Sequence, residues 1–118
     1  MLALRSDMPV YLACGITDLR KSIEGLAALV QEGFHLDPFA PALFVFCNRH
    51  HNKLKILHWE TNGFWLYYRR LERGHFQWPA TPTDTARTIT ARELQWLLDG
   101  LALEQRETHP PVQARFAL

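Results

Sequence analysis

The sequence predicts a single α+β domain, in which a small antiparallel sheet of three to five strands packs against one helix and a second helix lies near the C-terminus. Short apolar runs bounded by turn residues, which are typical of strands, fill the middle of the chain. Segments with apolar residues at helical spacing lie before and after them. The 118 residues, 47% of them hydrophobic, suit one packed unit. We place the domain at residues 1–103 and an irregular tail at 104–118.

The first part of the chain predicts one strand and one helix. The apolar run Val10–Cys14 follows a proline and suits a strand. Thr17 is a good N-cap for a helix over residues 18–32, because Asp18 would place an acidic side chain in its first turn. Apolar residues then recur at helical spacing, at Leu19, Ile23, Leu26, Leu29 and Val30.

Several strands are predicted between residues 43 and 79, and at least three of them form an antiparallel meander. They are Leu43–Cys47, Leu54–Glu60, Phe64–Arg70 and, as a fourth, His75–Trp78. The pair Asn62-Gly63 is a strong signal for a two-residue hairpin loop. With that loop Thr61 pairs with Phe64, and Lys55 faces Arg70. We therefore expect one positive patch across the two strands, formed by Lys53, Lys55, Arg69 and Arg70.

The last part of the chain predicts a loop and a helix. Residues 79–89 are rich in proline and threonine, which is typical of a loop. Thr90 and Glu93 have the spacing of a capping box, which marks the start of a helix over residues 91–101. The apolar face of this helix consists of Leu94, Leu97, Leu98 and Leu101.

Charge is segregated along the chain. The formal net charge is only +1, but residues 43–79 carry six basic and two acidic side chains, a net charge of +4. Bases interleaved with aromatic residues suit a polyanion such as nucleic acid. The candidate binding residues are Arg49, Lys53, Lys55, Trp59, Tyr67, Arg69, Arg70 and Arg73. Two alternatives remain open: the bases can meet a partner protein or only solvent, and the aromatic side chains can belong to the core.

The sequence offers no set of catalytic residues. Glu60 and Glu72 lie in the basic region without a third acid to complete a metal-dependent nuclease site. Adjacent His50 and His51 would point to opposite faces of a strand, which is poor geometry for one metal. No phosphate-binding glycine motif occurs. We therefore expect no enzyme, no metal and no cofactor.

The cysteines and the terminal sequence indicate a cytoplasmic protein. Cys14 and Cys47 lie far apart in apolar runs, as reduced thiols of a core do. The N-terminus lacks the pattern of a secretion signal. No apolar stretch is long enough for a membrane span, so no membrane partner is expected.

Two motifs carry a resemblance to a known family. The first runs from Gly15 through Thr17-Asp18-Leu-Arg20-Lys21, and the second is Arg69-Arg70-Leu-Glu72-Arg73-Gly74 followed by Trp78-Pro79. Over residues 9–101 the chain resembles the TnpB accessory ("Orf-two-like") proteins of the insertion-sequence family sixty-six. The resemblance implies a bacterial transposon protein that acts beside a separate, larger transposase and has no catalytic centre.

The resemblance also marks motif positions in this chain. They are Asp18, Arg20, Lys21, Lys53, Lys55, Trp59, Gly63, Tyr67, Arg69, Arg70, Glu72, Arg73 and Trp78. The function it implies is that of a non-catalytic accessory protein, which binds the DNA of the transposon ends, or RNA, through the basic-aromatic hairpins. The alternative is an adaptor that docks the transposase without touching nucleic acid. We expect Glu72 to accept hydrogen bonds from Arg69, Arg70 or Arg73 and so to hold the arginines in a fixed fan, the alternative being a solvated glutamate of little consequence.

Overall fold

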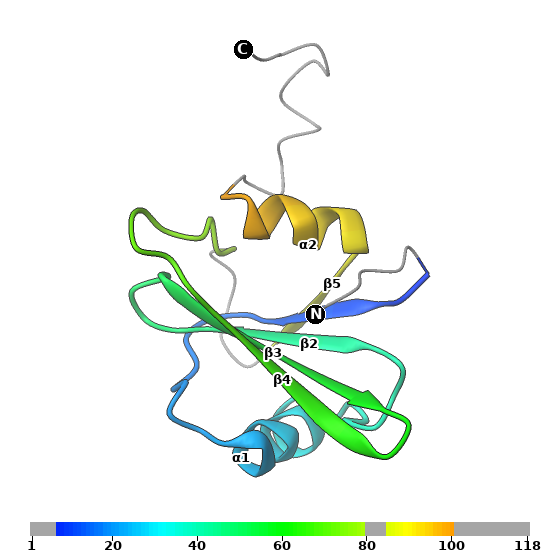
Figure 1. Ribbon diagram of the computed structural model, residues 1–118. Helices are drawn as coiled ribbons and strands as arrows, with labels where there is room; N and C mark the ends of the chain where they lie inside the picture. Colours follow the sequence, from blue (N-terminus) through cyan, green and yellow to red (C-terminus); the bar gives the residue numbers. More distant parts are fainter. Residues whose placement is uncertain (1–6, 80–84, 101–118) are drawn as a thin grey trace.

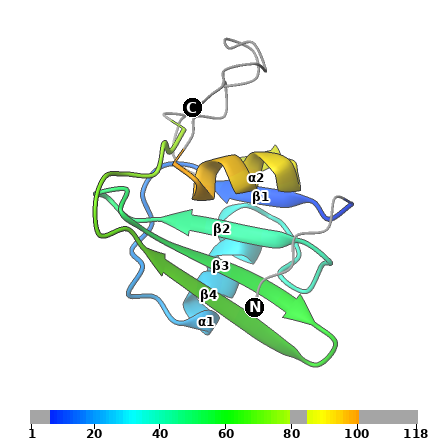
Figure 2. The same ribbon diagram turned by 45° about the horizontal axis from the view of Figure 1, so that its top comes forward.

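A five-stranded sheet forms the centre of the protein in a computed structural model, which describes residues 7–79 and 85–100 (Figure 1). The strands lie in the order β4-β3-β2-β1-β5. Their bounds are β1 Val10–Ala13, β2 Leu43–Cys47, β3 Lys53–Glu60, β4 Gly63–Arg70 and β5 Ala86–Ile89. Helices cover both faces, with α1 on one side and α2 on the other (Figure 2). The α+β class predicted from the sequence is confirmed.

The sheet is mixed, and the expectation of a wholly antiparallel sheet is wrong. β1 and β2 run parallel, whereas β2–β3, β3–β4 and β1–β5 are antiparallel pairs. Between β1 and β2 the chain crosses one face of the sheet as a helix, and such a crossover returns the chain to the end at which β1 began. The expected meander is present as β2-β3-β4.

The first helix begins later than the sequence predicts. α1 spans Ile23–Ala28, its N-cap is Ser22, and a π-helical turn at Leu29–Gly33 continues it. Thr17 is therefore no cap; it is buried, and its backbone N–H donates to the carbonyl of Cys47 over 2.9 Å. Residues 17–22 instead form a loop beside the end of β2, which places the first motif in that loop.

The C-terminal helix begins as predicted, at the capping box. α2 spans Ala91–Leu98, the hydroxyl of Thr90 accepts from the N–H of Glu93, and the carboxylate of Glu93 accepts from the N–H of Thr90. Before it lies β5, which the sequence analysis missed. A short strand in a threonine-rich segment has no apolar run to mark it, and only its pairing with β1 defines it. The expected end of the helix at residue 101 and the tail at 104–118 lie outside the described residues.

The predicted fourth strand at His75–Trp78 is absent from the described sheet. After β4 the chain turns at Gly74, whose φ of +76° favours glycine, and crosses back over the face that α2 covers. Phe76 and Trp78 are buried there, and the indole N–H of Trp78 donates to the carbonyl of Gly15 over 3.1 Å. Hydrophobic burial, and not strand pairing, therefore holds this segment.

The hairpin of β3 and β4 has a different register from the expected one. Its loop is Thr61–Asn62, so Glu60 pairs with Gly63 and Lys53 pairs with Arg70. Thr61 takes the positive φ (58°), and the N–H of Asn62 donates to the carbonyl of Glu60 in a γ-turn. Gly63 already belongs to the strand. The register thus differs by two residues, an even number, and every side chain keeps its predicted face.

Both cysteines are free and buried, as expected for core thiols. Burial raises the pKa of the Cys47 thiol to about 12. Among the described residues, no helix has the length and apolar character that crossing a membrane requires.

The segment that follows β4 provides a test of this core. Phe76→Ala should lower the free energy of unfolding by about 3–5 kcal/mol, because a side chain that is 1% exposed leaves a cavity. Gln77→Ala, a change at the exposed neighbour, should alter it by less than about 0.5 kcal/mol. Urea unfolding followed by tryptophan fluorescence measures both. Equal stabilities of the two variants would contradict the packing described for residues 71–79.

Candidate nucleic-acid interface

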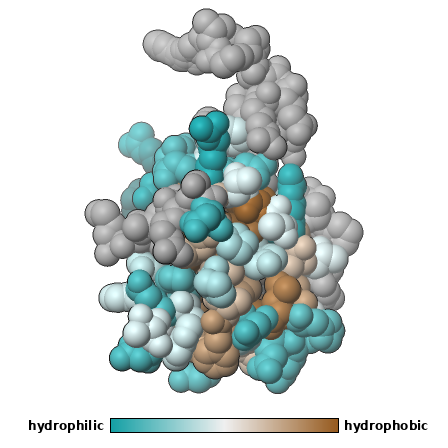
Figure 3. Space-filling view, turned by 90° about the vertical axis from the view of Figure 1, so that its right-hand side faces the viewer, coloured by the Kyte–Doolittle hydropathy of each residue, from teal (hydrophilic) through white to brown (hydrophobic). Residues whose placement is uncertain are grey.

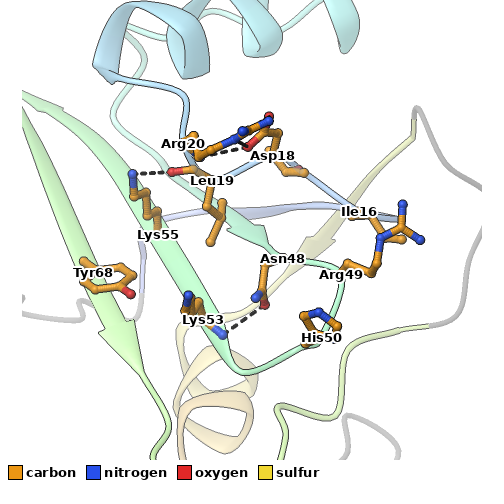
Figure 4. A pocket seen from close by; sticks show the side chains of 11 residues that line it. Ile16, Asp18, Leu19, Arg20, Asn48, Arg49, His50, Lys53, Lys55 and Tyr68 are labelled. Carbon is orange, nitrogen blue, oxygen red and sulfur yellow. Dashed lines mark hydrogen bonds and ion pairs between the residues drawn. The ribbon is translucent and has the colours of Figure 1, made fainter.

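An open groove of about 1160 Å³ lies at the end of the sheet where β2 turns into β3 (Figure 4). Its walls are the loop before α1, the turn at residues 48–52 and the neighbouring strands β3 and β4. Four cationic side chains line it: Arg20, Arg49, Lys53 and Lys55. Ile16, Leu19 and Tyr68 add apolar and aromatic surface. The groove thus combines positive charge with exposed carbon surface in one concave site.

A network of asparagine hydrogen bonds builds the turn between β2 and β3. The side-chain oxygen of Asn48 accepts from the backbone N–H groups of Asn52 and Lys53, at 3.1 and 3.0 Å. The side-chain nitrogen of Asn48 donates to the side-chain oxygen of Asn52 over 2.8 Å. His51 takes a positive φ of 55° within this turn. These bonds fix the backbone that carries Arg49, whose side chain is exposed beside the groove.

Lys55 joins the sheet to the loop before α1. Its Nζ donates to the carbonyl oxygen of Leu19 over 2.5 Å (Figure 4) and to that of Lys21 over 3.4 Å. The charge of Lys55 stays in the groove, because carbonyl groups do not neutralise it. Lys55 therefore has a structural role that no pattern in the sequence reveals, since its partners lie more than thirty residues away.

Asp18 and Arg20 of the first motif pair with one another. The Arg20 guanidinium donates to both carboxylate oxygens of Asp18, with an Nη2–Oδ2 distance of 2.8 Å, and the Arg20 backbone N–H donates to Oδ1 over 3.0 Å. The side-chain bond from Arg20 is the main reason that the pKa of Asp18 lies well below its usual range. Lys21, the third motif residue, is exposed and contributes its carbonyl to Lys55. The pair shapes the loop and offsets part of the charge of Arg20.

Two groove cations have no such partner. Within residues 7–79 and 85–100, the side chains of Arg49 and Lys53 form no hydrogen bond or ion pair. Lys53 lies directly opposite Arg70 on the neighbouring strand, and facing like charges repel each other by a few tenths of a kcal/mol. Glu72 relieves this repulsion in part, because its carboxylate accepts from Nε of Arg70 over 3.0 Å. An anion bound between the strands would relieve it further.

The predicted single patch of four bases is divided between the two faces of the hairpin. Lys53, Lys55 and Arg70 share the face that carries the groove, whereas Arg69 lies opposite Leu54 on the other face. The expectation that all four lie together is wrong for Arg69, because adjacent residues of a strand point to opposite sides. Of the three arginines offered as donors to Glu72, Arg70 forms the bond, whereas Arg69 and Arg73 do not among the described residues, so no fan of several arginines forms there. Arg73 is exposed in the turn after β4.

The two predicted aromatic residues lie away from the groove. Trp59 is half-buried, with its ring centroid 4.9 Å from that of Phe39 and 5.0 Å from that of Phe64. Tyr67, on the opposite face, packs against the core beneath α2 and stacks with Trp65 at 6.1 Å. Burial and the charge of Glu60 raise the pKa of Tyr67. These contacts favour the alternative in which both side chains are structural.

The aromatic residue that lines the groove is Tyr68, which the sequence analysis did not single out. It is 55% exposed and pairs with Lys55 across the hairpin, on the same face as Lys53. The alternation of β4 places Tyr68 and Arg70 on one face, and the sequence alone predicts this. Which of the two faces carries the groove is known only from the structure. Among the described residues, no three His, Cys, Asp or Glu side chains come together as a metal-binding set.

Comparisons with known proteins agree with the resemblance. The family model described as "IS66 Orf2 like protein" matches residues 8–108. The chain belongs to this family. Two relatives from Sinorhizobium fredii (strain NBRC 101917 / NGR234) are the uncharacterized proteins y4hO and y4jC. The first is 37% identical over 101 residues, with 86% of this chain and 87% of the relative covered. The second is 29% identical over 101 residues and covers 86% of both chains. No solved structure matches.

Lys55 and Lys53 form a matched pair for testing the architecture of this IS66 Orf2-like protein. Lys55→Met should lower the free energy of unfolding by about 1–3 kcal/mol, because it removes charge-assisted hydrogen bonds to two loop carbonyls. Lys53→Met, on the same strand face, should change it by less than about 0.5 kcal/mol. Urea unfolding measures the difference. If both variants unfold at the same urea concentration, Lys55 does not hold the loop.

Proposed function

We propose that the protein is a non-enzymatic accessory factor of transposition that binds nucleic acid in the groove. Family membership supports the accessory role. The observation that carries the binding proposal is the position of Arg49 and Lys53. Both line the groove, and neither has a side-chain partner within the described residues. The DNA of the element's own ends is the proposed ligand, with RNA as a further candidate and the transposase as the protein partner.

The electrostatics of the groove suit phosphate groups. Four cationic side chains face one carboxylate, that of Asp18, which Arg20 already engages. Cations that line a concave site focus the positive potential and raise the local concentration of a polyanion. Arg49 and Lys53 have no ion pair within the described residues that a ligand would have to break. Their bonds to phosphate groups would therefore contribute fully to the free energy of binding.

Removal of the two free cations tests this function. For Arg49→Ala with Lys53→Ala, the salt dependence of binding should become weaker, with a slope of log K against log salt that is smaller by roughly 1.5–2, because two phosphate contacts are lost. Fluorescence anisotropy with labelled oligonucleotides from the element's ends, at several salt concentrations, measures the slope. Circular dichroism checks the fold.

Arg92→Ala serves as the control variant. Arg92 is an exposed cation on α2, which covers the face opposite the one that carries the groove. Its removal changes the net charge in the same direction and should leave the slope nearly unchanged. If Arg92→Ala reduced the slope by about half as much as the double variant, as expected for one lost charge in place of two, binding would follow net charge and not the groove. Absence of binding to DNA and to RNA, even at low salt, would refute the proposed function.

A second candidate function is that of an adaptor for the transposase. An exposed aromatic side chain favours it: Trp65 is 52% exposed, stacks on the partly buried Tyr67, and its indole N–H donates to Glu60 over 2.8 Å. This pair lies on the face of the hairpin opposite the groove. Hydrophobic and hydrophilic residues are interspersed on the side of the molecule shown in Figure 3. An aromatic surface of this kind suits a protein contact.

The adaptor function has a separate test. Trp65→Ala should weaken binding to the purified transposase of the same element by at least about tenfold, as loss of an interface tryptophan does. Binding to oligonucleotides should stay unchanged, because Trp65 is outside the groove lining. Surface plasmon resonance at two salt concentrations measures the protein contact. Unchanged affinity of Trp65→Ala for the transposase would exclude this surface as the adaptor site.

A further inference from the structure

Tyr68 differs from the other aromatic residues of the hairpin. On its own face, Trp59 and Phe64 contact each other and Phe39, with ring centroids 4.9–5.4 Å apart. Tyr68 forms no ring contact and no side-chain hydrogen bond with any residue in the described part of the chain. It is 55% exposed at the β4 edge of the groove (Figure 4). The groove therefore carries a large aromatic ring that forms no ring contact or hydrogen bond within the described fold.

Three cations share the strand face that carries this ring. Lys55 pairs directly with Tyr68 across the hairpin. Lys53 and Arg70 form the next pair on the same face, two residues further along each strand. Further along the groove, the exposed side chain of Ile16 adds an apolar wall. A site built for phosphate groups alone has no need of aromatic and apolar surface. An aromatic ring beside backbone-binding cations is the arrangement that binds unpaired nucleotides, because the base stacks while the phosphates pair with the cations.

We propose that the groove binds single-stranded nucleic acid, with one unpaired base stacked on Tyr68 and the adjoining phosphates held by Lys53 and Arg49. This inference rests on the proposed function and names its ligand class. In a duplex the faces of the bases are stacked on one another, so a duplex would contact only the cations. The backbone that carries both cations is organised in advance, because the side chain of Asn48 fixes the turn that carries Arg49 and leads into Lys53. A preformed site loses less conformational entropy on binding.

Variants of Tyr68 test the stacking. The probes are a labelled oligothymidylate and a mixed-sequence duplex of equal length, at one salt concentration. The wild-type protein should bind the single strand more tightly than the duplex. Tyr68→Ala should weaken single-strand binding by about 5- to 150-fold, the range expected for loss of one stacking side chain. It should change duplex binding by less than about twofold, whereas Tyr68→Phe keeps the ring and should bind like the wild type.

Trp65→Ala is the matched control, since Trp65 is an equally exposed aromatic residue of β4 on the other face. It should bind the single strand like the wild type. A measurement on the unaltered protein guards against misfolding of the variants: ultraviolet cross-linking to a bromouracil-containing single strand, followed by mass spectrometry, should map the link to Tyr68.

The outcomes separate this inference from the proposed function. Wild-type affinity of Tyr68→Ala for the single strand, or cross-links that avoid Tyr68, would overturn the stacking role. Preference for the duplex, with binding that still depends on Arg49 and Lys53, would overturn the inference and leave the proposed function intact. If neither probe binds and only the transposase does, both fall, and the groove serves a protein partner.

Discussion

The parallel pairing of β1 with β2 is the constraint on which the candidate site depends. Because the two strands run in the same direction, the loop that leaves β1 and the turn that leaves β2 emerge at the same end of the sheet. The N–H of Thr17 donates to the carbonyl of Cys47 and joins them there. An antiparallel pair would send the two segments to opposite ends. The groove between them, with Arg20 on one side and Arg49 on the other, follows directly from this topology.

Two lysines that lie two residues apart on β3 have different roles. Lys55 lies deeper under the loop and bonds backbone carbonyls, so its ammonium group contributes to the fold as well as to the field of the groove. Lys53 lies toward the open end, opposite Arg70, and keeps its side chain free of partners among the described residues. The difference comes from the loop before α1, which passes over one lysine and not the other.

The aromatic residues of the hairpin divide in a similar way. Toward the turn of the hairpin, Trp59 and Phe64 support each other and the segment that precedes β2. Toward the open end, none of the described helices and loops covers β4 on the groove side, and Tyr68 is 55% exposed. The tip of the hairpin is thus stabilised by packing, while its base combines charge with an uncovered ring. This division gives the two ends of one pair of strands different surfaces.

The sequence by itself determined the elements whose signals are local. The apolar runs predicted β2, β3 and β4, the Thr90–Glu93 spacing predicted the start of α2, and the motifs around Asp18 and Glu72 predicted the family. Alternation along β3 and β4 also assigned each side chain to its face, and an even register shift left that assignment intact.

Only the tertiary structure decided which residues meet. β5 exists because β1 offers an unpaired edge, and residues 75–78 leave the sheet because Phe76 and Trp78 gain more from burial beneath α2. The path of the loop before α1 decides that Tyr68, and not Tyr67, lines the groove. It also decides that Lys55 is bonded while Lys53 keeps an unpaired charge among the described residues. That path is set by hydrogen bonds between residues some thirty positions apart, which no local pattern encodes.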